Sequence, residues 1–186
     1  QIKTPGGRVE AQVQDQGRMV VVEMGKVSFD STRIPVTGIP REVVDESITV
    51  LGQELRYSAA TIGNPHCVVQ RPATPEQVCE WGEVLENDPR FPNRINVQFL
   101  EVLDRNAIRI QIWERGAGYT LASGSSSCAA ASVAHRLGWC DHEIAVHMPG
   151  GRINITIQSG YALRMRGAVT RVGEITLHPE VFDGIL

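Results

Sequence analysis

The chain has 186 residues, which favours one domain or two small ones and is enough for a packed core. Hydrophobic residues make up 42% and charged residues 21%, and the formal net charge of −3 argues against a nucleic-acid partner. No apolar run approaches the roughly 20 residues of a membrane span and no signal-peptide pattern opens the chain, so we expect a cytoplasmic protein.

Most of the chain is typical of short strands joined by turn-prone residues. The predicted strands cover residues 9–13, 19–24, 53–61, 67–70, 96–102, 107–113, 143–148, 152–157, 162–166 and 169–177. In one of them Ile108, Ile110 and Ile112 alternate with polar residues, which is the pattern of a half-buried strand with one face on a core.

Helices are few. Thr74 followed by Pro75 predicts an N-cap and a first helical residue, for a helix that runs to about Leu85. A shorter helix is predicted over residues 40–49, and a third over residues 125–137, which ends at Gly138, a favourable residue just beyond a helix.

The third helix is made of small residues on nearly every side, from Cys128 to Ala134. Such a helix suits close approach by neighbours on several faces. In a chain this rich in strands we expect an α+β fold, with a curved mixed or antiparallel sheet wrapped around this central helix. The alternative is an alanine-rich helix on the surface.

Three segments have the residue types of a binding site. In the first, Glu114 and Arg115 follow a predicted strand, and Ser123, Gly124 and Ser125 lead into the small-residue helix. The start of a helix leaves about four N–H groups free and carries positive charge, so it suits an anionic ligand. The alternatives are that Ser123 or Ser125 only caps the helix and that Glu114 and Arg115 form a surface ion pair.

The second segment contains Asn64 and His66, and the third places Asn96 at the start of a strand. Taken alone, each asparagine is also typical of a turn. Together with Glu114 and Arg115 they could hold both ends of a zwitterionic amino acid, with Arg115 and the helix for the carboxylate and Glu114 for the ammonium. The sequence contains no phosphate loop or dinucleotide fingerprint, so we expect no cofactor.

The four cysteines stand far apart with no C-x-x-C pair, and the five histidines form no H-E-x-x-H pattern. These spacings predict no metal site and no disulfide framework. We interpret Cys67, Cys79, Cys128 and Cys140 as buried or incidental thiols.

The segment from Glu114 to Cys128 resembles the second signature of diaminopimelate epimerases, Glu-Arg-Gly-Ala-Gly-x-Thr-x-Ala, a catalytic position, and Gly-Ser before an alanine-rich helix. Four other segments match the family's order. They are residues 63–69 (Gly-Asn-Pro-His), 91–97 (Phe-Pro before Asn-Val), 148–151 (Pro-Gly-Gly), and 4–7 followed by Met24-Gly25. The resemblance covers nearly the whole chain.

The resemblance implies two similar α+β domains, each a sheet curled around a helix, with a cofactor-free site between them that epimerises LL- and meso-diaminopimelate in lysine biosynthesis. It implies substrate contacts by Asn64, Asn96, Glu114, Arg115, Gly124 and Ser125, with His66 as an auxiliary residue beside the site. Residues 1–28 would be a remnant of the first domain, 29–165 the second domain, and 166–186 a return to the first. The implied partners are the missing amino-terminal half of the protein, a small amino-acid substrate and a second copy in a homodimer.

Two departures bear on catalysis. The family uses one thiol from each domain to move a proton on Cα, and the upstream Cys-Gly-Asn-Gly segment with the first thiol is absent, so we expect this chain alone to be inactive. The second departure is Ser123 at the position of the second thiol, followed by Gly-Ser-Ser-Ser where the family usually has Gly-Ser/Thr-Gly-Ala.

A cysteine thiol has a pKa of about 8.5, and the pKa of an aliphatic hydroxyl is several units higher. Each pKa unit corresponds to about 1.36 kcal/mol. A helix end supplies only about 0.3–2 kcal/mol, so Ser123 is a poor base but can donate a proton. Three hypotheses remain open: serine as the acid opposite a thiol of the missing half, an engineered serine in a two-thiol epimerase, or a divergent racemase or isomerase of another amino acid. A fourth is a binding protein without proton chemistry.

Overall fold

The structure is a computed structural model, and it describes residues 1–4 and 7–183. The strands are β1 (Ile2–Thr4), β2 (Gly7–Val9), β3 (Ala11–Gln14), β4 (Met19–Lys26), β5 (Glu46–Val50), β6 (Gln53–Thr61), β7 (Pro65–Val69), β8 (Asn96–Asp104), β9 (Ala107–Glu114), β10 (Gly118–Thr120), β11 (Glu143–Met148), β12 (Gly151–Ile157) and β13 (Ala162–Ala168). The α-helices are α1 (Pro75–Glu86) and α2 (Gly124–Arg136). Short 3₁₀ turns lie at 15–17, 159–161 and 179–182.

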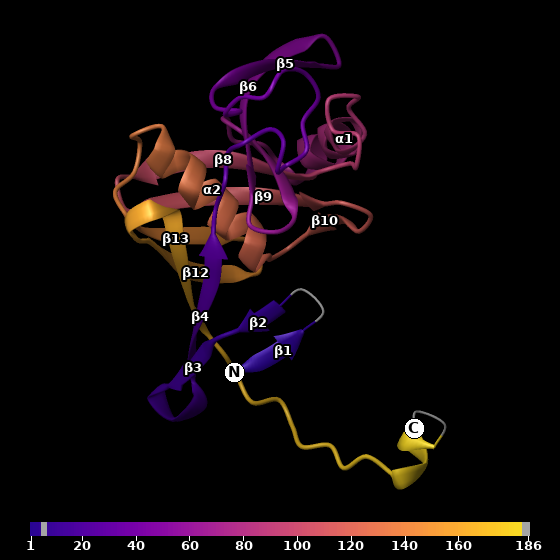
Figure 1. The fold of residues 1–186 in the computed structure, drawn as a ribbon, viewed down its shortest axis with the longest axis vertical. Coiled ribbons are helices and arrows are strands. Elements are labelled where there is room, and N and C mark those ends of the chain that lie inside the picture. The colour runs from indigo at the N-terminus through magenta and orange to yellow at the C-terminus, as the bar shows by residue number, and fades with distance from the viewer. Residues whose placement is uncertain (5–6, 184–186) are drawn as a thin grey trace.

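Most strands join one mixed sheet in the order β3-β4-β13-β12-β11-β9-β8-β7-β6-β5, with β10 added beside β9. The β7–β8 and β9–β11 pairs are parallel, and the others are antiparallel. The first two strands form a separate hairpin. This sheet curves around α2, as Figure 1 shows, and α1 lies on its other side.

The small-residue helix is the centre of the main core. Every residue of α2 from Ser126 to Ala134 is buried, and the helix packs against strands on both halves of the sheet. Ile108, Ile110 and Ile112 all turn their side chains into this core, as their alternation predicts. The prediction of a sheet wrapped around a central helix is therefore confirmed, and the alternative of a surface helix is wrong.

The other helix anchors a second core on the opposite face of the sheet. Thr74 caps α1 with its hydroxyl, which accepts from the Gln77 backbone, and the Gln77 side chain accepts in return from the Thr74 backbone. Trp81 and Leu85 are buried beside Phe99. Gly82 lies so close to Trp113 of β9 that an added Cβ would be 2.5 Å from the indole. The predicted helix start at Thr74–Pro75 is confirmed.

Two predicted elements are wrong. Residues 40–49 form no helix, because Glu42 bridges to Asp30 and residues 46–50 pair with β6. Residues 169–177 form no strand, because no neighbouring strand among the described residues pairs with them, and Val172 and Ile175 are 98% and 87% exposed. Of the segment 4–7 compared with the family, Pro5 and Gly6 lie outside the described residues.

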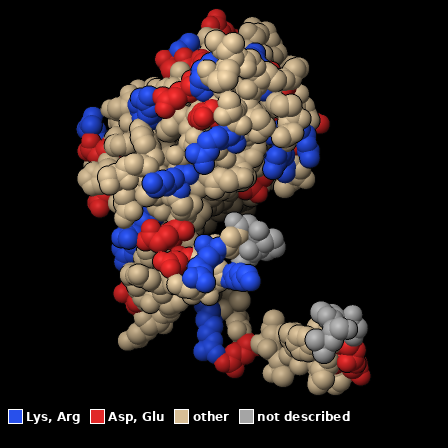
Figure 2. Space-filling model, viewed as in Figure 1, with Lys and Arg blue, Asp and Glu red and all other residues tan. Residues whose placement is uncertain are grey.

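Basic and acidic side chains intermingle on the face shown in Figure 2. No helix in the described ranges is long and apolar enough to cross a membrane. All four cysteines are free thiols, three of them buried and Cys79 exposed.

Candidate active site at the amino end of α2

Ser123 is the N-cap of α2. Its extended backbone (φ −155°, ψ 126°) turns into the helix, and its Oγ accepts from the Ser126 backbone N–H at 3.4 Å. The Ser127 hydroxyl donates to the Ser123 carbonyl at 2.8 Å. The capping role considered from the sequence is therefore confirmed for Ser123, which is half-buried at the positive end of the helix.

The start of α2 is held against the end of β11. The Ser123 N–H points to the sulfur of Met148 at 3.5 Å, and the Ser127 hydroxyl oxygen lies 3.2 Å from the same sulfur. The turn after β11 also contacts the segment before the helix, because the Gly150 N–H donates to the Leu121 carbonyl at 2.8 Å. A Cβ on Gly150 would lie 3.0 Å from that carbonyl oxygen, so glycine allows the close approach. The Pro-Gly-Gly segment thus lies beside the site.

Asn64 reaches the first turn of α2 from the loop between β6 and β7. Its Nδ2 donates to the Ser125 hydroxyl at 3.3 Å, and both side chains are half-buried. Gly124 lies between Ser123 and Ser125, and a Cβ there would be 2.9 Å from the Met165 sulfur of β13. The structure therefore brings Asn64, Ser123, Gly124 and Ser125 together at one end of the helix.

Asn96 joins the Asn-Pro-His loop to the turn that carries Arg115. Its Nδ2 donates to the Pro65 carbonyl at 2.8 Å, and its Oδ1 accepts from the Arg115 backbone N–H at 3.0 Å. The side chain is buried, 8% exposed. Both ends of the carboxamide therefore bind backbone groups, and each atom keeps one further hydrogen-bonding position.

Glu114 is the last residue of β9 and Arg115 is the first residue of the turn that follows, and both are half-buried. The Arg115 guanidinium donates to the Asn93 carbonyl at 2.8 Å. Within residues 1–4 and 7–183, neither side chain has an ion-pair partner, and the Glu114 carboxylate accepts no hydrogen bond. The surface ion pair between them considered from the sequence is therefore not formed. One unpaired cation and one unpaired anion are available for a ligand with both charges.

Glu86 is a residue that sequence reasoning missed. Its buried carboxylate accepts from Trp113 Nε1 at 2.7 Å, from the Gly116 backbone N–H at 3.0 Å and from Arg94 at 2.8 Å. It thereby fixes the turn that follows Arg115. The available signal was its position, because a carboxylate in the last turn of a helix opposes the macrodipole and needs another reason to be there.

His66 lies fully buried on the sheet face that is turned toward α2. Among the described residues, neither of its ring nitrogens has a hydrogen-bond partner. Burial lowers the pKa of His66 to about 3, an effect that Gln98 partly opposes and the Arg115 charge reinforces. The imidazole is therefore neutral at physiological pH, and its auxiliary role stays a prediction.

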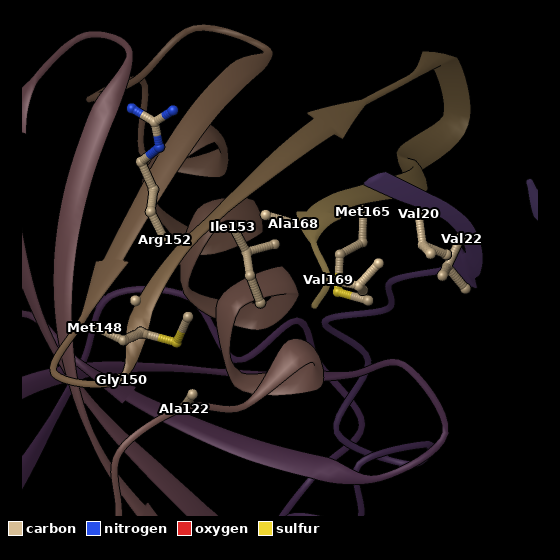
Figure 3. A pocket seen from close by; sticks show the side chains of 12 residues that line it. Val20, Val22, Ala122, Met148, Gly150, Arg152, Ile153, Met165, Ala168 and Val169 are labelled. Carbon is tan, nitrogen blue, oxygen red and sulfur yellow. The ribbon is translucent and has the colours of Figure 1, made fainter. Parts of the chain in front are cut away.

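An apolar cavity of about 440 Å³ lies beside the start of the helix, between β4, β13, β12 and residue 122. Figure 3 shows Met148 and Ala122 on one side of it and Val20, Val22 and Met165 on the other. None of the eight predicted site residues is among its lining residues. In the described part of the chain, no group of His, Cys, Asp and Glu side chains is arranged to hold a metal ion.

Comparison with known proteins identifies relatives of this chain. A family model described as diaminopimelate epimerase matches residues 58–172. Diaminopimelate epimerase 2 of Nostoc sp. is 52% identical over 97% of this chain and 64% of that protein, and diaminopimelate epimerase of Stutzerimonas stutzeri is 39% identical over 93% and 63%. The chain thus spans less than two thirds of the length of these relatives.

Solved structures share the fold at low sequence identity. A probable proline racemase from Agrobacterium radiobacter superposes with a TM-score of 0.67 at 16% identity, covering 98% of this chain and 61% of that one. A hydroxyproline epimerase from Agrobacterium vitis gives a TM-score of 0.64 at 17% identity, covering 89% and 55%. The α+β epimerase-like fold predicted from the sequence is therefore confirmed.

Proposed function

Because the chain belongs to the diaminopimelate epimerase family, we propose that it supplies one half of a cofactor-free active site that moves a proton on the Cα of an amino acid. The substrate that the relatives' names favour is diaminopimelate, interconverted between its LL and meso forms in lysine biosynthesis. The observation that carries the proposal is that Glu114 and Arg115 have no ion-pair partner among the described residues, in a turn that Asn96 joins to the loop whose Asn64 contacts the first turn of α2.

In the proposed complex the substrate carboxylate binds Arg115 and the N–H groups at the start of α2, and the ammonium group binds Glu114. Asn64 and Ser125 donate from the rim of the helix, and Asn96 uses its remaining hydrogen-bonding positions. This placement leaves the α-hydrogen facing Ser123, which caps the same turn. Binding of both charged groups would fix the orientation of Cα.

Ser123 serves as the proton donor in this proposal, opposite a thiol of the preceding domain. Its oxygen already accepts one hydrogen bond, and no described residue accepts its own hydrogen. In one direction the Ser123 O–H bond breaks as the new Cα–H bond forms, and in the reverse direction the alkoxide takes that proton back. Because the pKa of an aliphatic hydroxyl lies far above neutral, this exchange is expected to be slow in both directions. The engineered serine and the divergent racemase or isomerase remain the competing hypotheses.

We also propose that residues 1–28 and 166–186 belong to the first domain and residues 29–165 to the second, although 184–186 lie outside the described residues. The pairing of residues 166–168 of β13 with residues 19–21 of β4 supports assigning the two outer segments to one domain, because it places them side by side at the end of the sheet that curves around α2. The longer relatives support a preceding half of the protein as partner. We propose cytoplasmic location and a homodimer on the family resemblance alone.

The test is deuterium incorporation at Cα of LL- or meso-diaminopimelate in heavy water, with this chain joined to its preceding domain. We expect slow exchange, faster exchange in Ser123→Cys, and loss of substrate binding in Arg115→Gln. Arg109→Gln is the matched control, since Arg109 is an exposed arginine of β9, the strand that ends just before Arg115. No exchange with any amino acid tried would overturn the enzymatic proposal. Binding that persists without exchange would favour a non-catalytic relative.

A further inference from the structure

A buried polar chain leads from the sheet to Ser123. Gln98 of β8 and Ser126 of α2 are both 0% exposed, and the Gln98 Nε2 donates to the Ser126 hydroxyl at 3.0 Å. The backbone N–H of the same Ser126 donates to the Ser123 hydroxyl. The residues paired with Gln98 on the two adjacent strands, Val68 and Ile112, are apolar, so the buried amide of Gln98 depends on Ser126 for a hydrogen bond.

His66 lies on the other side of Gln98 from Ser126. Residue 66 of β7 pairs with residue 96 and residue 68 with residue 98, so His66 and Gln98 are diagonal neighbours on the same face of two parallel strands. The Gln98 Oε1 and both nitrogens of His66 are buried and have no partner among the described residues. A neutral imidazole that donates to this oxygen would satisfy one group at each end.

At the start of α2 this chain departs from the family pattern at Ser123, Ser126 and Ser127, and the first two of these bear on the proposal. Ser123 stands at the position of a thiol, and Ser126 stands where the pattern has glycine. A glycine there would offer the same backbone N–H but no hydroxyl to bind Gln98. The serine at 126 therefore gives the first turn of α2 a side-chain anchor in the core.

We propose that Gln98 and Ser126 are positioning residues for Ser123, which hold its oxygen as an acceptor on the inner side and so direct its hydrogen toward the ligand. The proposal rests on the proposed function only for the role of Ser123 itself. The Gln98 amide fixes the Ser126 side chain, and the Ser126 N–H is thereby kept within reach of the Ser123 oxygen. A hydrogen bond from the His66 imidazole to Gln98 Oε1, two groups that have no other partner among the described residues, would orient the Gln98 amide.

A thiol placed at position 123 reports on this geometry without any substrate. Ser123→Cys is made together with Cys79→Ser, which removes the exposed thiol of the chain, and alkylation by iodoacetamide is followed against pH. The midpoint of that profile measures the pKa of the reporter thiol, which an N–H donor at a helix end lowers. The plateau rate measures access, so loosening of the helix alone changes the plateau and leaves the midpoint.

We expect Gln98→Leu and Ser126→Ala each to raise the midpoint, with about a threefold loss of thiolate below it, as fits a weakened interaction at a helix end. Ser126→Thr keeps the hydroxyl and should restore the original midpoint. The matched control is Ser132→Ala, since Ser132 is an equally buried serine of α2 whose hydroxyl bonds only to the Cys128 carbonyl.

An unchanged midpoint in Ser126→Ala would overturn the proposal, as would an equal change in Ser132→Ala. If Gln98→Leu does not fold, Ser126→Ala and Ser126→Gly decide the outcome. Because the readout contains no amino acid, an absence of Cα exchange leaves it valid. Conversely, exchange accompanied by an unchanged midpoint would retain the proposed function and remove the positioning role.

Discussion

Replacement of Glu86 tests whether a buried carboxylate at the end of α1 holds the turn that carries Arg115. Its bonds to Trp113 Nε1 and the Gly116 N–H are hydrogen bonds to a charged group, each worth about 1.5–3 kcal/mol. The pair with Arg94 adds under about 1 kcal/mol, because that side chain is 55% exposed. Since the three share one carboxylate, we expect Glu86→Ala to lower the free energy of unfolding by about 3–5 kcal/mol.

Glu86→Gln separates charge from shape. The amide retains one acceptor oxygen, but its NH₂ group meets a second donor, either Trp113 Nε1 or the Gly116 N–H. We expect a loss of about 1.5–3 kcal/mol. The control is Glu83→Gln on the exposed side of the same helix, which should change stability by less than about 0.5 kcal/mol.

Urea unfolding followed by circular dichroism measures both variants. Amide exchange at Gly116 then shows whether the turn itself has loosened, because its N–H bonds directly to Glu86. The reasoning is refuted if Glu86→Gln is as stable as Glu83→Gln and the Gly116 amide keeps its protection.

Three further variants test the packing and the buried histidine. Gly82→Ala should lower the free energy of unfolding by about 1–3 kcal/mol in urea, because its Cβ overlaps the Trp113 indole, and a neutral effect would contradict the helix–sheet contact. Ala130→Leu should lower the free energy of unfolding by at least as much, or prevent folding, since Ala130 is fully buried in the central helix. An unchanged stability in urea would contradict close packing around that helix. Below pH 6.5 His66 is protonated in the unfolded chain but stays neutral in the native protein. The free energy of unfolding of the wild type should therefore fall by on the order of 2–3 kcal/mol by about pH 4.5. His66→Gln should abolish that loss, whereas His142→Gln, the control at an exposed histidine, should not. If the stability of His66→Gln and of the wild type fell equally between pH 6.5 and 4.5, the burial of His66 would be contradicted.

Local patterns were enough for the elements that depend on neighbouring residues. Three local patterns each predict the structure of their own segment from a few neighbouring residues. They are the capping box at Thr74, the alternation of Ile108 to Ile112 and the small residues of α2. Two segments were predicted wrongly. Residues 46–50 form a strand because they pair with β6 in a hairpin across Leu51 and Gly52, a local turn that the sequence analysis did not recognise. Residues 169–177 form no strand because no described strand pairs with them, which only the folded structure could show.

The candidate site divides in the same way. The motif resemblance in the sequence named Ser123, Asn64, Asn96 and the Glu114–Arg115 pair, and the structure brings the first two to one helix end and joins Asn96 to the Arg115 turn. The substrate contacts themselves remain predictions.

By itself the sequence determined the central helix, the family and the residue types at the start of α2. These depend on composition and on spacing along the chain. Only the tertiary structure decided which buried polar groups support the start of α2 and the turn that follows Arg115. Glu86 meets Gly116 and Gln98 meets Ser126 across about 30 intervening residues. A glutamate or glutamine gives no local sign of such a partner, since its worth depends on what the folded sheet places opposite it.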